Sequence, residues 1–451
     1  MQQIRQTIPG FAGELVGPED EGYDTHREVW NAMVDRRPAL IARCTSADDV
    51  AAAVRHGREH DLEIGVKCGG HSAVGLSVPH GGLMIDLSPM NQVRVDPAAR
   101  RAVVGGGALL RSLDQAAQAH GLATTAGNVS HTGVGGLTLG GGMGWLARQA
   151  GLACDNVESY TVVTAEGEMV RATATDHADL YWGLRGGGGN FGVVTEFVFR
   201  LHPVAGDVLV VELTFDAADA FEPMRRWRDL LRDAPRSATL TADAVTVEGR
   251  PVVIIGYVWV GNAEEGMAYL PTMRSIGTPR EESVTPMRYV ELQSIGDANH
   301  HHGRRRYSAG HYMTELPNAA IEAFITRGVA RPEDVDWTTV SGGGFQAYGG
   351  AIAEVSNEDS AFSHRDSLVE FFCGQTWDDP AEDEQRMASA RAFGAVLAPF
   401  ASGVYVNVFE EGEDSLRRAY GEPKLARLAT LKRRYDPDNL FHLNQNIAPA
   451  P

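Results

Sequence analysis

The stretch KCGGHSAVGLS, Lys67–Ser77, decides how the first half of the chain is interpreted. Two adjacent glycines, Gly69 and Gly70, follow a short apolar run and come directly before His71. Glycine allows positive φ angles and lets the backbone approach a ligand closely. His71 therefore stands where a ligand would meet the main chain. At this point it remains open whether His71 is a packing residue, a general base, a metal ligand or something rarer.

The composition is that of a globular protein and argues against several partners. The chain has 451 residues, 43% apolar and 22% charged, which fits two or three domains or one two-lobed enzyme. A net charge of −19 argues against nucleic acid and anionic membranes. The chain start lacks the apolar run of a signal peptide, and no apolar run of about 18 residues exists. We therefore expect a cytoplasmic protein without a membrane span.

Cysteines and histidines give no metal signal. Cysteine occurs four times without a C-x-x-C pair, at Cys44, Cys68, Cys154 and Cys373, which we expect to be reduced thiols. The three histidines at 300–302 are consecutive, so neither a helix nor a strand would aim them at one ion. We interpret the arginines that follow, Arg304 to Arg306, as a basic rim of the substrate mouth or as a solvated loop. An anionic or polyphenolic substrate would suit such a rim.

The pattern of residues changes near position 205, which divides the chain into two parts. Residues up to 205 alternate short strands and helices, such as the strand 39–44 and the helix that Ser46 can cap. Beyond this point glycine thins out, and we expect strands at 208–215, 251–261, 342–355 and 367–372. The tail predicts a helix that stops near Asp436. These patterns favour an α+β fold with two packed lobes.

Three glycine loops lie in the first half, at 69–75, 133–144 and 186–192. The last contains GGGNFG, a match to the dinucleotide pattern G-x-G-x-x-G, but VVTEFVFR after it is typical of a strand. A Rossmann site needs a helix there, so we reject that fold. The loops are either unrelated tight turns or a cradle in which backbone N–H groups hold an extended anionic ligand such as FAD.

Six segments together resemble the FAD-linked oxidases of the vanillyl-alcohol oxidase superfamily, in the berberine-bridge-enzyme-like branch. They span residues 39–447 and read ALIARCTSADDV, GGHSAVGLS, SHTGVGGLTLGGGMGWLARQAGLACDN, LRGGGGNFGVVTEF, YVN and YDPDNLFHLNQNI. Bacterial 6-hydroxynicotine oxidases and polyketide-pathway flavoprotein oxidases are similar members. The resemblance implies a PCMH-type FAD-binding domain at 1–205 and an antiparallel-sheet substrate domain at 206–405. The segment 406–451 would return to the first domain.

The resemblance also implies how the cofactor is held. The histidine of GGH is joined to the flavin 8α carbon in this family, so His71 is the expected single link. Some relatives have a second link through a cysteine, but Val129 occupies that place here, and Cys154 lies too far along the chain. The other expected cofactor residues are Gly69, Gly70, Ser72, Leu76, Ser130, Thr132, Gly133, Gly136, Leu137, Gly140, Gly142, Trp145, Asp155, Asn156, Gly189, Val193, Gln445 and Asn446.

The same resemblance supplies candidates for catalysis. Tyr405 and Asn407 match the family's Y-x-N strand, and we rank Tyr405 first as the base. A tyrosine has an ordinary pKa near 10, so this role needs nearby positive charge or hydrogen bonds. Tyr348 and Gln346 come next, since they alternate on one strand of the substrate sheet. Asp359, before FSHR, is the last candidate.

Three functions remain open. The first is an oxidase that uses O₂, with Thr132 and Leu137 on the oxygen side of the flavin, acting on a C–O or C–N bond of a small secondary metabolite. The second is a flavin-N5-oxide type oxygenase or cyclase with a polyketide-like substrate. The third is a flavin-binding protein without turnover. The resemblance also suggests a homodimer.

Overall fold

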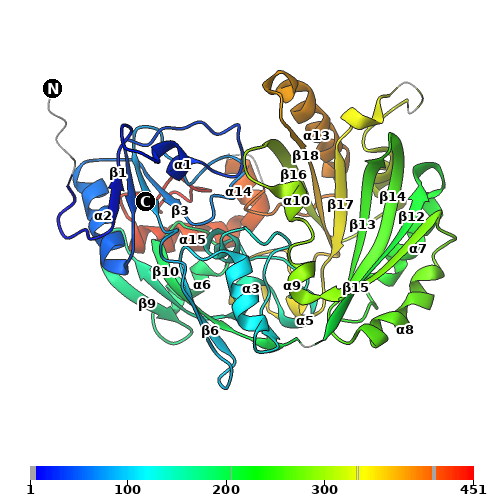
Figure 1. Ribbon diagram of the computed structural model, residues 1–451, viewed down its shortest axis with the longest axis horizontal. Helices are drawn as coiled ribbons and strands as arrows, with labels where there is room; N and C mark the ends of the chain where they lie inside the picture. Colours follow the sequence, from blue (N-terminus) through cyan, green and yellow to red (C-terminus); the bar gives the residue numbers. More distant parts are fainter. Residues whose placement is uncertain (1–6, 205, 332, 334, 409–412) are drawn as a thin grey trace.

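The computed structural model describes residues 7–204, 206–331, 333, 335–408 and 413–451. The first six residues, which entered the expectation about a signal peptide, and residue 205 at the expected domain boundary lie outside these ranges. Two lobes lie side by side, one holding the N-terminal half and the other the green-to-orange segments (Figure 1). No helix in the described ranges is long and apolar enough to cross a membrane.

The first lobe is built on two larger sheets and one small one. One sheet has the order β1-β2-β4-β3, with β2, β4 and β3 parallel, and the antiparallel second has the order β5-β6-β10-β8-β9. The strands are β1 (Glu14–Val16), β2 (Leu40–Arg43), β3 (Ile64–Lys67), β4 (Leu83–Asp86), β5 (Val93–Asp96), β6 (Arg101–Gly105), β8 (Val157–Val163), β9 (Met169–Thr173) and β10 (Val193–Arg200), with a small pair of β7 (Leu122–Ala123) and β11 (His202–Pro203). The helices are α1 (Tyr23–Arg27), α2 (Ala47–Glu59), α3 (Leu110–Gln118), α4 (Val134–Leu139), α5 (Ala147–Ala150) and α6 (Ala178–Leu184).

Local sequence explains several of these elements. The Ser46 hydroxyl accepts a hydrogen bond from the Asp49 backbone N–H at 3.1 Å, which confirms the predicted N-cap of α2. The apolar face of α2, including Val50 and Val54, packs into the core beside the parallel strands. The glycine loop ending at Gly192 opens into strand β10, so the rejection of a Rossmann site is also confirmed.

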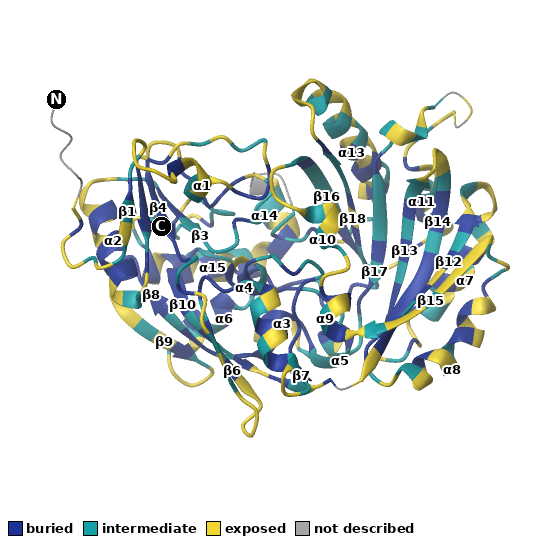
Figure 2. Ribbon diagram, viewed as in Figure 1, coloured by how far each residue is buried: buried dark blue, intermediate teal, exposed yellow. Residues whose placement is uncertain are grey.

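The second lobe is one seven-stranded antiparallel sheet of order β15-β12-β14-β13-β17-β18-β16. Its strands are β12 (Asp207–Asp216), β13 (Ala238–Val247), β14 (Arg250–Trp259), β15 (Glu281–Arg288), β16 (Arg305–Met313), β17 (Gly342–Ala347) and β18 (Val369–Trp377). Its outer face packs against α7 (Phe221–Leu230), α8 (Ala263–Arg274), α11 (Asn318–Thr326) and α13 (Asp383–Leu397). The inner face is turned toward the first lobe (Figure 2).

Several sequence expectations for this lobe were wrong. Strands β13, β15 and β16 were not predicted, although β13 lies in the middle of the sheet. The run 342–355 is strand only as far as Ala347; the positive φ angles of Gly349 and Gly350 then turn the chain into the short helix α12 (Ala351–Glu354). Strand β13 alternates apolar and polar residues from Ala238 to Ala244, but its apolar positions are mostly alanine, which is depleted in strands; β16 includes charged residues and a glycine, which also give a weak strand signal.

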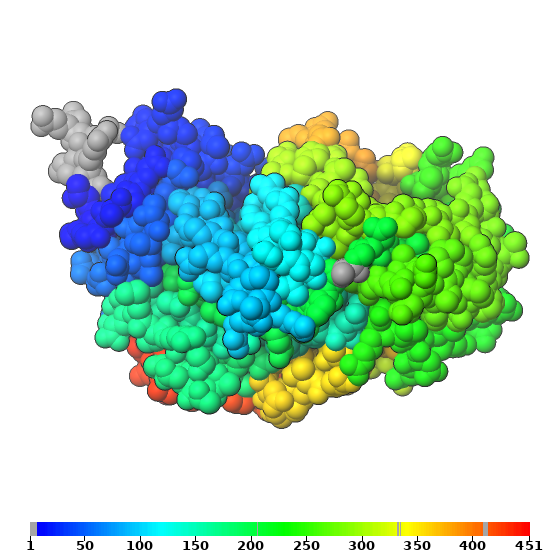
Figure 3. Space-filling model, turned by 60° about the horizontal axis from the view of Figure 1, so that its bottom comes forward, coloured from blue at the N-terminus to red at the C-terminus, as the bar shows by residue number. Residues whose placement is uncertain are grey.

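The C-terminal segment packs on the first lobe, where red atoms lie beside the teal residues in Figure 3. Helices α14 (Glu413–Tyr420) and α15 (Glu422–Tyr435) contribute Tyr420, Leu428 and Leu431 to the core of that lobe. The α15 helix stops beside Asp436, as the sequence predicted. Beyond it, the Ile447 backbone N–H donates to Asn190 Oδ1 at 2.9 Å, which ties the tail to the third glycine loop.

Candidate active site

His71 lies at the point where two glycine loops touch. A Cβ atom at Gly69 would come within 2.4 Å of the Gly133 nitrogen, so only glycine allows this contact. The neighbouring Gly70 has φ +64°, which turns the chain sharply before His71. The first and second glycine loops, distant in sequence, are therefore brought together around this histidine.

Aromatic rings surround the His71 imidazole. Its Nε2 lies 3.2 Å from Nδ1 of His131, and Trp30 stacks on it with ring centroids 4.1 Å apart. The Arg306 guanidinium lies over the Trp30 ring, 3.7 Å from its centroid. Burial, and then the neighbouring His131 and His302, lower the pKa of His71 to about 2. His71 is therefore a neutral imidazole at physiological pH.

Buried polar atoms around the loops indicate room for a large polar ligand. Such atoms are almost always hydrogen-bonded in folded proteins. Within the described residues, several at this site have no partner: His131 Nε2, Asn128 Oδ1, Gln346 Nε2, Asn444 Oδ1 and Asn446 Oδ1. A Cβ atom placed on Gly136 or Gly189 would meet nothing within 4 Å, so the loops border open space. These features fit the extended, polar FAD molecule that the resemblance predicts.

The other predicted cofactor residues differ in what their side chains contact. Most lie on the glycine loops or the tail: Ser72, Leu76, Ser130, Thr132, Leu137, Gly140, Gly142 and Gln445. Two others use their side chains internally. Both carboxylate oxygens of Asp155 bond to Arg365, at 2.8 and 2.9 Å, and the Asn156 amide bonds to Ala150, Leu152 and His202. Asp155 and Asn156 therefore stabilise the loop that they belong to, rather than offering free polar groups.

Trp145 and Val193 are packing residues in the structure. The Trp145 ring packs between the lobes, and its backbone carbonyl accepts a hydrogen bond from Thr239 of β13. Val193 is buried at the start of β10. The Val193 side chain can offer a cofactor only van der Waals contact, whereas the buried Trp145 indole N–H has no partner among the described residues and is available as a donor.

A second polar cluster lies on the inner face of the seven-stranded sheet. The Tyr348 hydroxyl lies 3.2 Å from both the Tyr312 hydroxyl and Oε2 of Glu370. Gln346 is the β17 neighbour of Glu370, and its Oε1 accepts a hydrogen bond from Asn128 of the first lobe at 2.9 Å. Two of the predicted catalytic residues, Tyr348 and Gln346, are thus brought together with the flavin-side loops.

Tyr405 joins this cluster from the C-terminal segment. Its ring centroid lies 6.3 Å from that of Tyr312, and its hydroxyl oxygen accepts a hydrogen bond from Asn407 Nδ2 at 3.1 Å. The Tyr405-to-Asn407 run is not the predicted strand: it follows a single bridge at Gly403 and then forms a turn. This turn lets both side chains point to the same place. Burial, and then Glu370, raise the pKa of Tyr405 well above its ordinary value.

Glu370 and Tyr312 are the site residues that sequence reasoning missed. Burial raises the pKa of Glu370 to about 7, an effect that the hydrogen bond from Tyr348 partly offsets. A carboxylic acid with that pKa can both accept and release a proton near neutrality. The signal was present in LVEFF, where one glutamate interrupts the apolar run of a buried strand. Tyr312 was hidden because β16 was not predicted.

Two expectations need correction. Asp359 is exposed on a short 3₁₀ turn, where its backbone carbonyl accepts a bond from Arg185, so it does not join the cluster. Arg304 and Arg305 pair with Asp378 and Asp383, and Arg306 is 4% exposed under Trp30. These arginines therefore form neither a free basic rim nor a solvated loop.

Cys154 packs beside the tyrosines, and burial raises its pKa to about 12, which keeps the thiol protonated.

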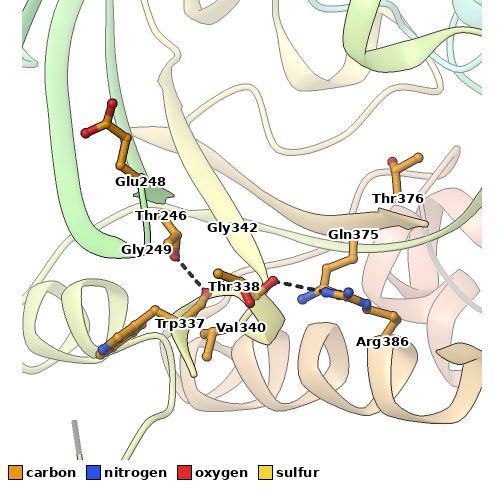
Figure 4. Close-up of a pocket in the computed structure, with 10 residues that line it drawn as sticks. All are labelled: Thr246, Glu248, Gly249, Trp337, Thr338, Val340, Gly342, Gln375, Thr376 and Arg386. Carbon is orange, nitrogen blue, oxygen red and sulfur yellow. Dashed lines mark hydrogen bonds between the residues drawn. The ribbon is translucent and has the colours of Figure 1, made fainter. Parts of the chain in front are cut away.

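A cavity of about 420 Å³ lies at the far end of the sheet (Figure 4). Its polar groups bond to one another: Thr246 donates to the Trp337 carbonyl at 2.9 Å, and Arg386 donates to the Thr338 carbonyl at 3.1 Å. Gly342, which lines it, precedes Gln346 by four residues, or about 13 Å of strand. The candidate catalytic side chains therefore lie on the inner face and not in this cavity.

Comparison with known proteins agrees with this geometry. Residues 38–173 match a family described as an FAD binding domain, and residues 404–448 match one described as berberine and berberine like. An FAD-linked oxidoreductase of Dictyostelium discoideum is 32% identical over 423 residues, which cover 93% of this chain and 91% of that protein. The (R)-6-hydroxynicotine oxidase of Paenarthrobacter nicotinovorans is 30% identical over 454 residues, which cover 97% of each chain.

A solved structure supports the same assignment. The crystal structure of 6-hydroxy-D-nicotine oxidase from Arthrobacter nicotinovorans superposes with a TM-score of 0.88 and 27% identity, covering 99% of this chain and all of that one. A berberine-bridge-enzyme-like protein of Physcomitrella patens, 24% identical with a TM-score of 0.87, has the same fold. The chain belongs to the FAD-linked oxidoreductases of the berberine-bridge-enzyme-like branch of the vanillyl-alcohol oxidase superfamily.

Proposed function

We propose that this enzyme is an oxidase that holds FAD covalently through His71 and oxidises a C–O or C–N bond of a small secondary metabolite. The observation that carries this proposal is strand β16, which joins two chemically different groups. Arg306, beneath the Trp30–His71 stack, and Tyr312, in the Glu370 cluster, lie on its inner face. Tyr312 is six positions after Arg306 along the strand. This distance of about 20 Å is enough for a flavin ring system followed by a small substrate.

The division of the chain follows from this arrangement. Residues 1–205 and the returning segment 406–451 would bind the cofactor, and 206–405 would form the substrate wall. His71 is suited to a covalent bond because its burial keeps it neutral, with a free lone pair on one ring nitrogen. We assign His71 Nε2 as the donor in its 3.2 Å contact with His131 Nδ1, which leaves that lone pair on His71 Nδ1.

Glu370 is the proposed proton acceptor, in place of Tyr405. No cation among the described residues lowers the pKa of Tyr405, and burial raises it, so its phenol stays protonated. Its oxygen already accepts a hydrogen bond from Asn407. Its O–H is left to donate to a substrate oxygen or nitrogen. Glu370, with its pKa of about 7, can take the substrate proton directly or through Tyr348.

Bound FAD would supply hydride acceptance at flavin N5 and electron transfer to O₂. The lobes shield Tyr312 and Tyr348, which are 1% and 2% exposed, whereas Glu370 and Tyr405 are partly exposed, as a proton acceptor and a donor to the substrate must be. We further propose a cytoplasmic location, because the four cysteines are unpaired, and a homodimer, on the resemblance alone.

The test of this function is an oxygen and peroxide balance. Purified protein would be screened with small alcohols and amines, with O₂ uptake, H₂O₂ release and product mass measured together. An oxidase releases one H₂O₂ for each O₂ consumed, and its product lacks two hydrogens. A product that has gained oxygen without peroxide release would establish the oxygenase alternative. Absence of flavin reduction by every substrate would instead indicate a binding protein without turnover.

A further inference from the structure

The inner face of the seven-stranded sheet carries a row of residues next to the catalytic cluster. In β13, β17 and β18 the residues Ala242, Phe345 and Phe371 face the core under the helices. Their successors and predecessors along each strand must face the first lobe, because side chains alternate. This places Asp243, Gly344 and Phe372 on the inner face.

Strand register sets these residues side by side. Asp243 pairs with Gly344, Gly344 with Phe372, and Phe372 with Gly310 of β16. Side chains therefore alternate with glycines across the row. A Cβ atom at Gly344 would lie 2.1 Å from Oδ1 of Asp243, so the carboxylate leans over the glycine into the space toward Phe372.

The Asp243 carboxylate has no partner in the part of the chain that the structure describes: no hydrogen-bond donor or cation contacts it. Burial, and then Glu212, raise its pKa to about 7. Phe372 is 39% exposed, one of few large apolar side chains with that exposure. Gln346, two residues from Gly344 on the same face, has a buried Nε2 atom without a partner among the described residues. Two polar groups without partners among the described residues, Asp243 and Gln346 Nε2, thus lie on the same face of the sheet as the exposed ring of Phe372.

We propose that Asp243 and Phe372 form a substrate subsite that binds a protonated amine beside an apolar body. The proposal rests on the oxidase function and adds the substrate class. A half-buried carboxylate is costly unless it is paired, and a second carboxylate nearby favours a cation over an anion. Arg306, a cation on this face, is already bonded to the His300 and His301 carbonyls. The ammonium group would therefore come from the substrate.

The subsite also fixes which part of the substrate reacts. Glu370 lies opposite Gln346, one row along from Asp243 and two strands across. Strand spacing and rise put the two carboxylates' Cα atoms about 12 Å apart. The ammonium group held at Asp243 is consequently remote from the bond oxidised near Glu370. An amino alcohol or a diamine with an apolar body has that layout.

The test compares probes that share one ring and differ in charge. Isothermal titration calorimetry would measure binding of benzylamine, benzyl alcohol and phenylacetate to the flavin-loaded protein, to Asp243→Asn and to Glu212→Gln. Benzylamine should bind about tenfold tighter than benzyl alcohol, and phenylacetate weakest. Asp243→Asn should remove the amine preference, whereas Glu212→Gln should keep most of it. Equal binding of the amine and the alcohol to the native protein would overturn the subsite.

Two controls keep the result decisive. Phe372→Ala, at an exposed position that the fold does not need, should weaken all three probes equally, and it serves if Asp243→Asn does not fold. A Phe372→Ala variant that binds the probes as the native protein does would contradict the subsite. The flavin spectrum of each sample separates the two proposals. Flavin without amine preference overturns the subsite alone, and amine preference without flavin overturns the oxidase function.

Discussion

The two ends of the active site differ in the kind of polar group they hold. At the histidine end, His71, His131 and His302 are neutral imidazoles whose pKa values burial lowers. At the tyrosine end, Glu370 has its pKa raised to about 7. Burial acts at both ends with opposite sign, because it disfavours the charged form of either group. The difference suggests that one end attaches the cofactor and the other exchanges protons.

Removing the carboxylate at the tyrosine end should have the largest effect on turnover. Glu370→Gln keeps the shape and the bond from Tyr348 but cannot accept a proton. We expect kcat to fall by roughly 10²–10⁴, with flavin content unchanged. Steady-state O₂ uptake and the flavin absorbance of the same sample measure both. Glu322→Gln, on the outer helix α11, is the matched control and should behave as the native enzyme. A Glu370→Gln enzyme with native kcat would remove the proton role from this end.

Asp114, a buried acid on α3, tests whether burial alone raises a carboxyl pKa. Asp114 bonds to Gln293, and burial raises its pKa to about 7. Between the ordinary value of 3.8 and about 7, the unfolded state releases a proton that the folded state keeps, so stability falls as pH rises. Asp114→Asn removes this loss. The gain in free energy of unfolding of Asp114→Asn over the native protein should be about 2–4 kcal/mol larger at pH 8 than at pH 4.

Denaturant unfolding at the two pH values measures this difference. Asp383→Asn, whose carboxylate pairs with Arg305 near the surface, is the contrasting variant. Arg305 lowers the pKa of Asp383, so that stabilisation is present at high pH and lost as pH falls. The two substitutions should therefore change the pH dependence in opposite directions. The same direction for both would mean that burial does not govern Asp114.

The pH profile of turnover should report the tyrosine end. If Glu370 accepts the proton, kcat rises up to tenfold per pH unit below its pKa of about 7 and levels off above it. The rise should be absent in Glu370→Gln and retained in Tyr405→Phe, which we expect to lower kcat by about tenfold through loss of a hydrogen bond. If the rise of kcat with pH were lost in Tyr405→Phe and kept in Glu370→Gln, Tyr405 and not Glu370 would be the proton acceptor.

The smallest expected effect is at the histidine end. His131→Ala removes the only side chain that contacts His71 Nε2 within the described ranges. Covalent attachment should slow several-fold, since the favoured tautomer is lost, while noncovalent FAD binding persists. Timed in-gel fluorescence after mixing apoprotein with FAD would follow it. His302→Ala is the control, because that ring touches His71 edge-on without a hydrogen bond. Equal slowing in both variants would reduce His131 to a packing role.

The histidine end could be predicted from the sequence because its parts are local. GGH, the second glycine loop and the tail motif each occupy a few consecutive residues, and glycine marks the close approach of Gly69 to Gly133 directly. The tyrosine end is assembled from β16, β17, β18 and the segment after Gly403. Its pairings depend on strand register across the lobe, which no local pattern specifies.

Glu370 illustrates the limit. The resemblance offered Asp359, the last-ranked candidate, because it precedes FSHR, but Asp359 is exposed on the 3₁₀ turn Asn357–Asp359, whose Glu358 carbonyl accepts a bond from Trp182. A single glutamate in an apolar strand carries no indication of its neighbours until β16 and β17 are placed on either side. Arg304 to Arg306 were misjudged for the same reason, since β16 was not predicted: Arg304 and Arg305 pair with Asp378 and Asp383 far along the chain, and Arg306 bonds to the nearby His300 and His301 carbonyls under Trp30.

The most direct test of the contrast between the two ends is the intact mass of the denatured protein. Native protein and the His71→Ala and His120→Ala variants would be unfolded in acid, desalted and weighed by mass spectrometry. The account predicts that native protein and His120→Ala, changed at an exposed histidine, are heavier than their sequences by one FAD, and that His71→Ala has its sequence mass. Native protein at its sequence mass, or His71→Ala still carrying FAD, would contradict it.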